Sequence, residues 1–187
     1  IPPSGLSEAV RGLSTTTNFS SFGQRGTDMA TVKFITIGTL KEDYLKDAVC
    51  EYEKRLSGFC KVENINIKES KLPADPSQGD IKKALEEEGR AVLSHMSDRA
   101  YKIVMCIEGK QFSSEELSEK INHAFSVSNE ICFVIGSSHG LCDSVKSAAD
   151  LKLSISKLTF PHQLMRVILL ESVYRCMNIL KGTKYHK

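Results

Sequence analysis

The sequence predicts an α/β fold in which a parallel sheet lies between two layers of helices (α/β/α). From position 32 onward, short apolar segments rich in β-branched residues alternate with amphipathic segments of helical period. Such strands are joined by crossover helices, which make the strands parallel and cover both faces of the sheet. No run approaches the roughly 18 apolar residues of a membrane span, so we expect no membrane-crossing segment.

Five strands and five helices are expected in this part of the chain. The strands are predicted at 32–37, 62–67, 103–107, 131–135 and 151–155, and the helices at about 40–58, 81–96, 113–125, 143–149 and 161–180. Thr39-x-x-Glu42 and Ser113-x-x-Glu116 have the form of capping boxes that begin two of the helices. Pro161 suits the first turn of the last helix and Gly182 its end.

The first 28 residues have a composition unlike the rest and are predicted to be a disordered leader, with the folded domain at 29–187. They contain nine Ser or Thr residues, Arg11 and Arg25, and only two acids. This composition is typical of an organellar transit peptide, for a chloroplast or a mitochondrion. The chain begins at Ile1, so we expect the natural start upstream. An ordinary disordered tail, and a cytoplasmic protein that starts at Met29, are the alternatives.

The formal net charge of +2 conceals a basic C-terminal region. From Lys152 onward, seven Lys or Arg residues stand against one acid, Glu171, which gives this region +6 and leaves about −4 for the rest. A basic element beside a mildly acidic body suggests a polyanionic partner such as RNA. A solubilising charged surface explains the same charges equally well.

The sequence contains few of the usual catalytic signatures. Six cysteines occur without any CxxC spacing, which favours structural thiols over disulfides or a metal site. The loop Gly136-Ser-Ser-His-Gly140 follows an apolar strand, where Gly136 would let a ligand approach the backbone. Taken by itself, this loop is better explained as a tight turn between a strand and a helix.

The last helix is apolar over a wider arc than one sheet face requires. The apolar residues are Leu164, Val167, Ile168, Leu169, Leu170 and Val173. Two interpretations remain open: a second contact such as a dimer interface, or deep burial within the monomer.

Several motifs in the last third resemble the RlmH-type, SPOUT-class methyltransferases. They are 133–141 (FVIGSSHGL), 153–167 (LSISKLTFPHQLMRV), Glu171-x-x-Tyr-Arg175 and the terminal Tyr185-His-Lys187. Three earlier segments, 41–45, 51–56 and 107–110, fit the same pattern, so the resemblance covers about 32–187. It implies an enzyme that methylates N3 of a pseudouridine in large-subunit ribosomal RNA with S-adenosyl-L-methionine. A SPOUT enzyme for another RNA and a non-catalytic ribosome-binding module are the alternatives.

The resemblance also implies a SPOUT fold with a C-terminal trefoil knot, an exception to the rule that chains are unknotted. The methyl donor would be held in the knot by three loops, through backbone groups and apolar walls. Carried over residue by residue, the cofactor-binding residues are Met105, Gly136, Ile155, Ser156, Lys157, Leu158, Thr159 and Phe160. The family usually has Leu where Met105 stands, and often Gly where Ser137 stands. Ser137 either crowds the donor or merely adds a hydroxyl.

Three residues are expected to act on the RNA base. His186 titrates near neutrality and suits proton handling, Arg166 suits phosphate or base carbonyls, and Tyr185 suits stacking on a base. The resemblance implies a homodimer in which the partner completes each site. For His162 we expect a structural role at the helix start, and for His139 either a ligand contact or a solvent-facing turn. Lys157 suits an RNA phosphate, and Glu171 with Arg175 an i,i+4 ion pair.

Overall fold

The structure, a computed structural model, describes residues 29–183 and Tyr185. Within them the strands form one sheet in the order β2-β1-β4-β3-β5, and every pair is parallel. The predicted α/β/α arrangement is confirmed. The strands are β1 (Thr31–Ile37), β2 (Lys61–Ile67), β3 (Tyr101–Lys110), β4 (Glu130–Ile135) and β5 (Leu151–Leu153). The helices are α1 (Asp43–Leu56), α2 (Gln78–His95), α3 (Ser114–Val127), α4 (Asp143–Ser147) and α5 (His162–Leu180).

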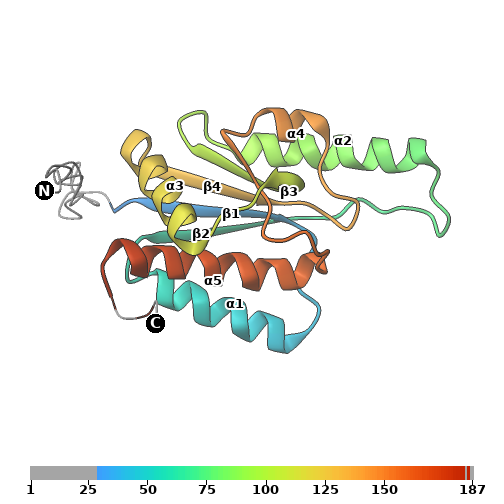
Figure 1. Cartoon of the computed structure of the whole chain (residues 1–187). Coiled ribbons are helices and arrows are strands. Elements are labelled where there is room, and N and C mark those ends of the chain that lie inside the picture. The colour runs from blue at the N-terminus through green and yellow to red at the C-terminus, as the bar shows by residue number, and fades with distance from the viewer. Residues whose placement is uncertain (1–28, 184, 186–187) are drawn as a thin grey trace, which may run out of the picture.

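Each face of the sheet is covered by its own set of helices (Figure 1). Helices α1, α3 and α5 pack on one face, where Phe34 of β1 stacks on Phe133 of β4 with ring centroids 5.4 Å apart. Helices α2 and α4 cover the other face, where Ile35 and Val134 are buried. Alternate residues of the central strands therefore enter two separate cores, as expected for a sheet buried on both sides.

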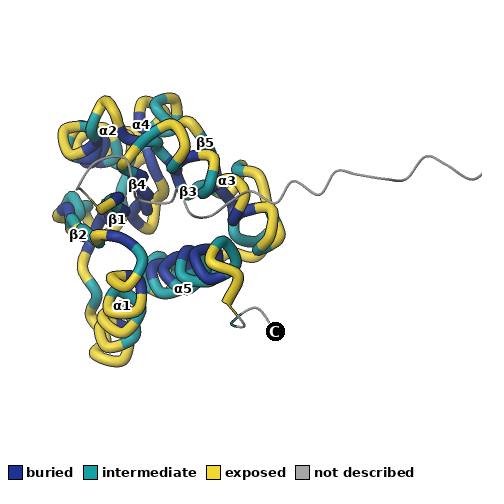
Figure 2. The backbone as a smooth tube through the Cα atoms, turned by 90° about the vertical axis from the view of Figure 1, so that its left-hand side faces the viewer, coloured by how far each residue is buried: buried dark blue, intermediate teal, exposed yellow. Residues whose placement is uncertain are grey.

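Helix α5 lies between α1 and α3, so it is contacted on both flanks as well as by the sheet (Figure 2). Leu169, Leu170 and Val173 are buried by these contacts, whereas Leu164 is 37% exposed. Burial within the monomer thus accounts fully for three of the six apolar residues of the arc, while Val167 and Ile168 are half-buried. The dimer interface stays a prediction.

Two predicted capping boxes have opposite outcomes. The Ser113–Glu116 box is confirmed, with both reciprocal hydrogen bonds present at the start of α3. The Thr39–Glu42 box is wrong. Helix α1 begins at Asp43 with Glu42 as its N-cap, and the cap makes no side-chain hydrogen bond. The segment before α1 makes another contact: the Lys41 backbone N–H donates to Gln163 Oε1 of α5 at 2.9 Å.

The remaining differences lie at element boundaries. Helix α2 starts at Gln78, earlier than its apolar pattern predicts, because Ser77 and Asp80 form a capping box. Strand β3 is longer than expected and β5 shorter. Among the described residues, no helix combines the length and hydropathy of a transmembrane span. The predicted leader, 1–28, lies outside the described residues, and the trefoil knot stays a prediction.

Candidate functional site

The carboxyl ends of β3, β4 and β5 surround a cavity of about 360 Å³. In a parallel α/β sheet this edge is where ligands bind, because the loops that leave neighbouring strands meet there. Seven of the eight residues predicted to bind the cofactor line this one cavity: Met105, Gly136, Ile155, Ser156, Leu158, Thr159 and Phe160. The eighth, Lys157, is exposed and is not part of the lining. Three segments that are distant in sequence are thus brought together as predicted.

The first wall of the cavity is an excursion in β3. Both Met105 and Lys110 pair with Leu153 of β5, so residues 106–109 bulge out of the ladder. A Cβ added at Gly109 would lie 2.6 Å from the Leu153 carbonyl carbon, so only glycine lets the two backbones approach here. The bulge places Ile107 at the rim of the cavity with 84% of its surface exposed.

The second wall is the loop 136–140 after β4. A Cβ on Gly136 would lie 2.4 Å from the Gly140 carbonyl oxygen, so glycine is required for the loop to turn on itself. The Gly140 N–H donates to the Ser137 carbonyl at 3.0 Å, and Gly140 has a φ of +89°. A tight turn therefore explains Gly136 without any ligand, although the same loop lines the cavity.

Two other residues of this loop, Ser137 and His139, have different surroundings. The Ser137 side chain is buried and its hydroxyl donates to Glu88 of α2 at 3.0 Å. His139 is exposed, and its Nδ1 lies 3.2 Å from the Ser138 hydroxyl. His139 is thus a solvent-facing turn residue that also lines the cavity, and the predicted ligand contact stays a prediction.

The third wall is the segment that connects β5 to α5. The Ser154 N–H donates to the Lys110 carbonyl at 2.9 Å, and the Ser154 hydroxyl donates to the Ser156 carbonyl at 3.1 Å. The Leu158 N–H in turn donates to the Ser156 hydroxyl at 3.0 Å. These bonds hold the segment in shape while Leu158 remains 70% exposed at the cavity rim.

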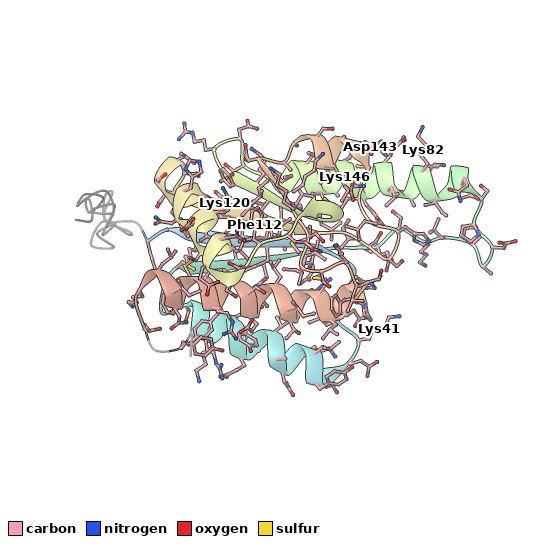
Figure 3. All side chains as sticks on the ribbon, in the orientation of Figure 1. Lys41, Lys82, Phe112, Lys120, Asp143 and Lys146 are labelled. Atoms are coloured by element: carbon pink, nitrogen blue, oxygen red, sulfur yellow. The ribbon has the colours of Figure 1, made fainter. Side chains whose placement is uncertain are left out.

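An ion pair lies at the edge of the cavity. Lys146, which α4 carries above the sheet in the view of Figure 3, binds Glu108 of the β3 bulge at 2.7 Å. The hydrogen bond from Lys146 lowers the pKa of the Glu108 carboxyl, and the same bond raises the pKa of Lys146. The pair joins the bulge to α4, and both residues line the cavity. Among the described residues no group of His, Cys, Asp and Glu is arranged to hold a metal ion.

Arg166 does not lie where a phosphate contact requires it. Its side chain is buried, and the guanidinium donates to the carbonyls of Ile37 and Gly38 and, at 2.9 Å, to Asn66 Oδ1. Its Nε has no partner, and burial lowers the pKa of the guanidinium. Arg166 thus has an internal role, in which it joins α5 to the ends of β1 and β2, and its predicted role at RNA stays a prediction. The sequence does not predict this burial, because Arg166 stands among other basic residues of the C-terminal region.

Tyr185 follows α5 in the chain and packs back on its C-terminal half, whereas His162 and Met165 line the cavity at the N-terminal end of the helix. The Tyr185 ring packs edge-on against Tyr174 with centroids 4.8 Å apart, and the Arg175 guanidinium carbon lies 5.3 Å from the Tyr185 centroid. Arg175 also forms the predicted ion pair with Glu171, at 2.5 Å. His186 lies outside the described residues.

Comparison with known proteins adds the family. The family model described as a predicted SPOUT methyltransferase matches residues 30–186. The chain belongs to the SPOUT methyltransferase family. The ribosomal RNA large subunit methyltransferase H of Streptococcus pneumoniae strain CGSP14 is 45% identical over 157 residues, which are 83% of this chain and 99% of that protein. The protein of the same name from strain 70585 is similar to the same extent.

Two solved structures are similar to this SPOUT methyltransferase at a lower level. A probable methylase family protein from Haemophilus influenzae Rd KW20 has a TM-score of 0.48 at 12% identity, over 83% of this chain and 70% of that one. The tRNA (m1G37) methyltransferase from Aquifex aeolicus has a TM-score of 0.46 at 14% identity, over 78% and 69%. At this level of overlap the likeness carries no functional statement. The predicted family rests on the sequence match, which confirms it.

Proposed function

We propose that this SPOUT methyltransferase transfers a methyl group from S-adenosyl-L-methionine to N3 of a pseudouridine in large-subunit ribosomal RNA. The observation that carries the proposal is the convergence of Met105, Gly136 and the 155–160 segment on one cavity at the carboxyl ends of the strands. The relatives named above, which share 45% of the aligned residues, support the class of RNA.

The cavity suits a nucleoside-type methyl donor. Its volume, about 360 Å³, lies in the usual range for small-molecule sites. Met105, Ile155 and Phe160 offer apolar walls, and the three strand ends bring backbone N–H and C=O groups to the same place. When bound, S-adenosyl-L-methionine supplies a methyl group that its sulfonium has already activated. The protein then has to align donor and acceptor and help remove the N3 proton.

The acceptor side is proposed to use the C-terminal tail. Histidine ordinarily titrates near neutrality, which suits His186 for transfer of the N3 proton, and Tyr185 offers an aromatic face to a base. Lys157 is exposed beside the cavity and suits an RNA phosphate. These roles divide the work between loops that hold the donor and side chains that hold the RNA.

We also propose that the active form is a homodimer. Tyr185 packs on Tyr174 in the C-terminal half of α5, whereas the cavity is lined by His162 and Met165 at the N-terminal end of this helix. Exposed apolar side chains, Ile107 and Leu158, surround the cavity and are available to a second copy. In this dimer, the C-terminal tail of one subunit completes the cavity of the other.

The organellar address is a separate proposal, supported by the Ser/Thr-rich, acid-poor composition of residues 1–28. A fluorescent protein fused behind these residues should enter chloroplasts or mitochondria. Diffuse cytoplasmic fluorescence would favour the alternative that begins at Met29.

The methylation proposal is tested by transfer of radioactive methyl groups to ribosomes and to purified ribosomal RNA. Wild type is expected to label the large-subunit RNA, and His186→Ala to label it at least about 100-fold more slowly, in the range of a lost general base. Digestion to nucleosides shows which base carries the label. Equal rates for the variant and wild type would remove His186 from the proposed site.

The donor site is tested by calorimetry with S-adenosyl-L-methionine. Gly136→Arg is a poor variant because the loop itself has no room for a side chain. Leu158→Arg changes an exposed position that lines the cavity, and Lys157→Ala is its matched control one residue away. We expect Leu158→Arg to weaken binding by about tenfold or more, and Lys157→Ala to leave it unchanged. Equal affinities would place the donor elsewhere.

A further inference from the structure

Two serine hydroxyls of the loop 136–140 donate hydrogen bonds to carboxylates on other segments of the chain. Ser137 donates to Glu88 Oε2 at 3.0 Å, and Ser138 donates to Glu69 Oε1 at 3.3 Å. We call these two pairs the serine–carboxylate clasp. Among the described residues, they are the hydrogen bonds that join this loop's side chains to α2 and to the segment after β2.

Glu88 is unusual because it is an acid in the interior of the protein. Its side chain is 4% exposed, and it forms no ion pair among the described residues. Its two oxygens are each used once: Oε1 accepts from the Ser70 backbone N–H at 2.8 Å and Oε2 accepts from Ser137. Burial of a polar side chain is costly unless its hydrogen bonds are made, so the buried position of Glu88 depends on these two donors.

The position of Glu88 makes it a link between three segments. It is carried by α2, it binds the chain just after β2 through Ser70, and it binds the loop after β4 through Ser137. Gly89, the next residue, lets the 141–145 segment pack closely, since a Cβ there would lie 2.1 Å from Cys142 Sγ. Glu88 therefore binds the loop near its start, at Ser137, and Gly89 lets the chain just after the loop, at Cys142, pack against α2.

We infer that Glu88 is a positioning residue for the methyl-donor loop, and that Ser137 is the group through which it acts. The inference rests on the proposed function, because the loop lines the cavity assigned to the donor at all five of its positions. Both hydroxyls donate to carboxylates, so neither the Ser137 nor the Ser138 hydroxyl is free to donate to a ligand. Ser137 therefore does not crowd the donor; it preorganises the loop that holds it.

The test variant is Ser137→Ala, which removes one hydroxyl and leaves Glu88 Oε2 without its donor. The matched control is Ser118→Ala on α3, another buried serine whose hydroxyl bonds within its own helix, to Glu115 at 2.7 Å. We expect Ser137→Ala to weaken S-adenosyl-L-methionine binding by about tenfold, the usual effect of losing a hydrogen bond to a charged group. The affinity of Ser118→Ala for S-adenosyl-L-methionine should stay within about twofold of wild type, even if its melting temperature falls as much as that of Ser137→Ala.

Glu88→Gln is the conservative variant that should preserve S-adenosyl-L-methionine binding. Its carbonyl oxygen can still accept from Ser70, and its amide can donate to the Ser137 hydroxyl, so affinity should stay within about threefold of wild type. Glu88→Ala keeps neither contact and should match or exceed the effect of Ser137→Ala. If Glu88→Ala binds the donor like wild type, the positioning role is wrong.

A second readout separates this inference from the proposed function. Hydrogen exchange of the Gly136–Gly140 amides in the ligand-free protein should accelerate in Ser137→Ala and not in Ser118→Ala. If wild type binds no S-adenosyl-L-methionine but this difference appears, the proposed donor fails while the clasp stands. Identical exchange and identical affinity in the two variants would overturn the clasp itself.

Discussion

The two ends of α5 differ in the kind of chemistry they present. At its N-terminal end, the cavity is formed by backbone segments that approach closely, at Gly109 and Gly136, and by apolar walls. At its C-terminal end, the surface is formed by side chains: Tyr185 packs on Tyr174, and Arg175 lies over the Tyr185 ring. The first end suits a ligand that is held by shape, and the second suits one that is held by stacking and charge.

This contrast matches what a methyltransferase has to do with its two substrates. A donor common to many enzymes can be held by main chain in a preformed cavity, whereas RNA is recognised through stacking, phosphates and single bases. The tail end has further groups of this kind, since Arg55 lies 5.3 Å from the Tyr52 ring and Lys181 lies 4.8 Å from the Phe59 ring. The proposed donor site and the proposed RNA-binding surface therefore lie at different parts of α5.

The largest expected effect comes from mixing two inactive variants. Leu158→Arg damages the cavity end and His186→Ala the tail end, and each alone should lose most methyl transfer. If each site uses one end from each subunit, mixed dimers regain one intact site, and activity should return to about a quarter of wild type at equal mixing. The measurement is methyl incorporation after the two proteins are co-refolded.

The mixing experiment has a direct control. Two variants of the same end, Leu158→Arg with Met105→Arg, should show no recovery in any proportion. Recovery that is absent in both mixtures, with each protein folded, would mean that a single chain supplies both ends.

The next effect concerns Arg166, whose guanidinium makes hydrogen bonds within the protein. Arg166→Met removes the donor to the Ile37 and Gly38 carbonyls and one of the two donors to Asn66 Oδ1, so the free energy of unfolding should fall by about 2–4 kcal/mol. Affinity for ribosomal RNA at low temperature should change little. Denaturant unfolding and filter binding measure the two quantities.

Lys157→Ala is the control for Arg166→Met, because it should change RNA affinity and leave stability the same. Its side chain is exposed, so stability should stay the same while RNA affinity falls by a few-fold, as for one phosphate contact. A stable Arg166→Met protein that has lost RNA binding would restore the RNA-contact role that the sequence predicts for Arg166.

The smallest effect is the pH dependence of the Glu108–Lys146 pair. Because Lys146 lowers the pKa of Glu108 below its ordinary 4.5, the pair contributes stability above that pH and loses it as pH falls through the lowered pKa. Glu108 is about half exposed, so the contribution is small. The melting temperature of wild type should exceed that of Glu108→Gln near neutrality. A difference that stays constant down to pH 3 would contradict this.

The cavity is easier to predict from the sequence than the charged residues around it. Met105, Gly136 and 155–160 are grouped by the family resemblance, whose motifs lie at the strand ends, and all of them except Lys157 line the cavity. Glu88 leaves no such signal, because it stands in an acidic run, 86–88, which is typical of a solvated helix face. Its partner Ser137 is 49 positions away, so only the fold brings the pair together.

The sequence by itself determined the parallel α/β/α class, and its resemblance to a known family gave the family and seven of the residues that line the cavity. Periodicity suffices for the class, because strands and helices are specified by neighbouring residues. Tertiary structure decided which charges are free. Arg166 is buried against carbonyls, Lys157 is exposed outside the cavity lining, and Glu88 holds two distant segments. The role of a charge depends on the partners that folding places around it, and those partners are remote in sequence.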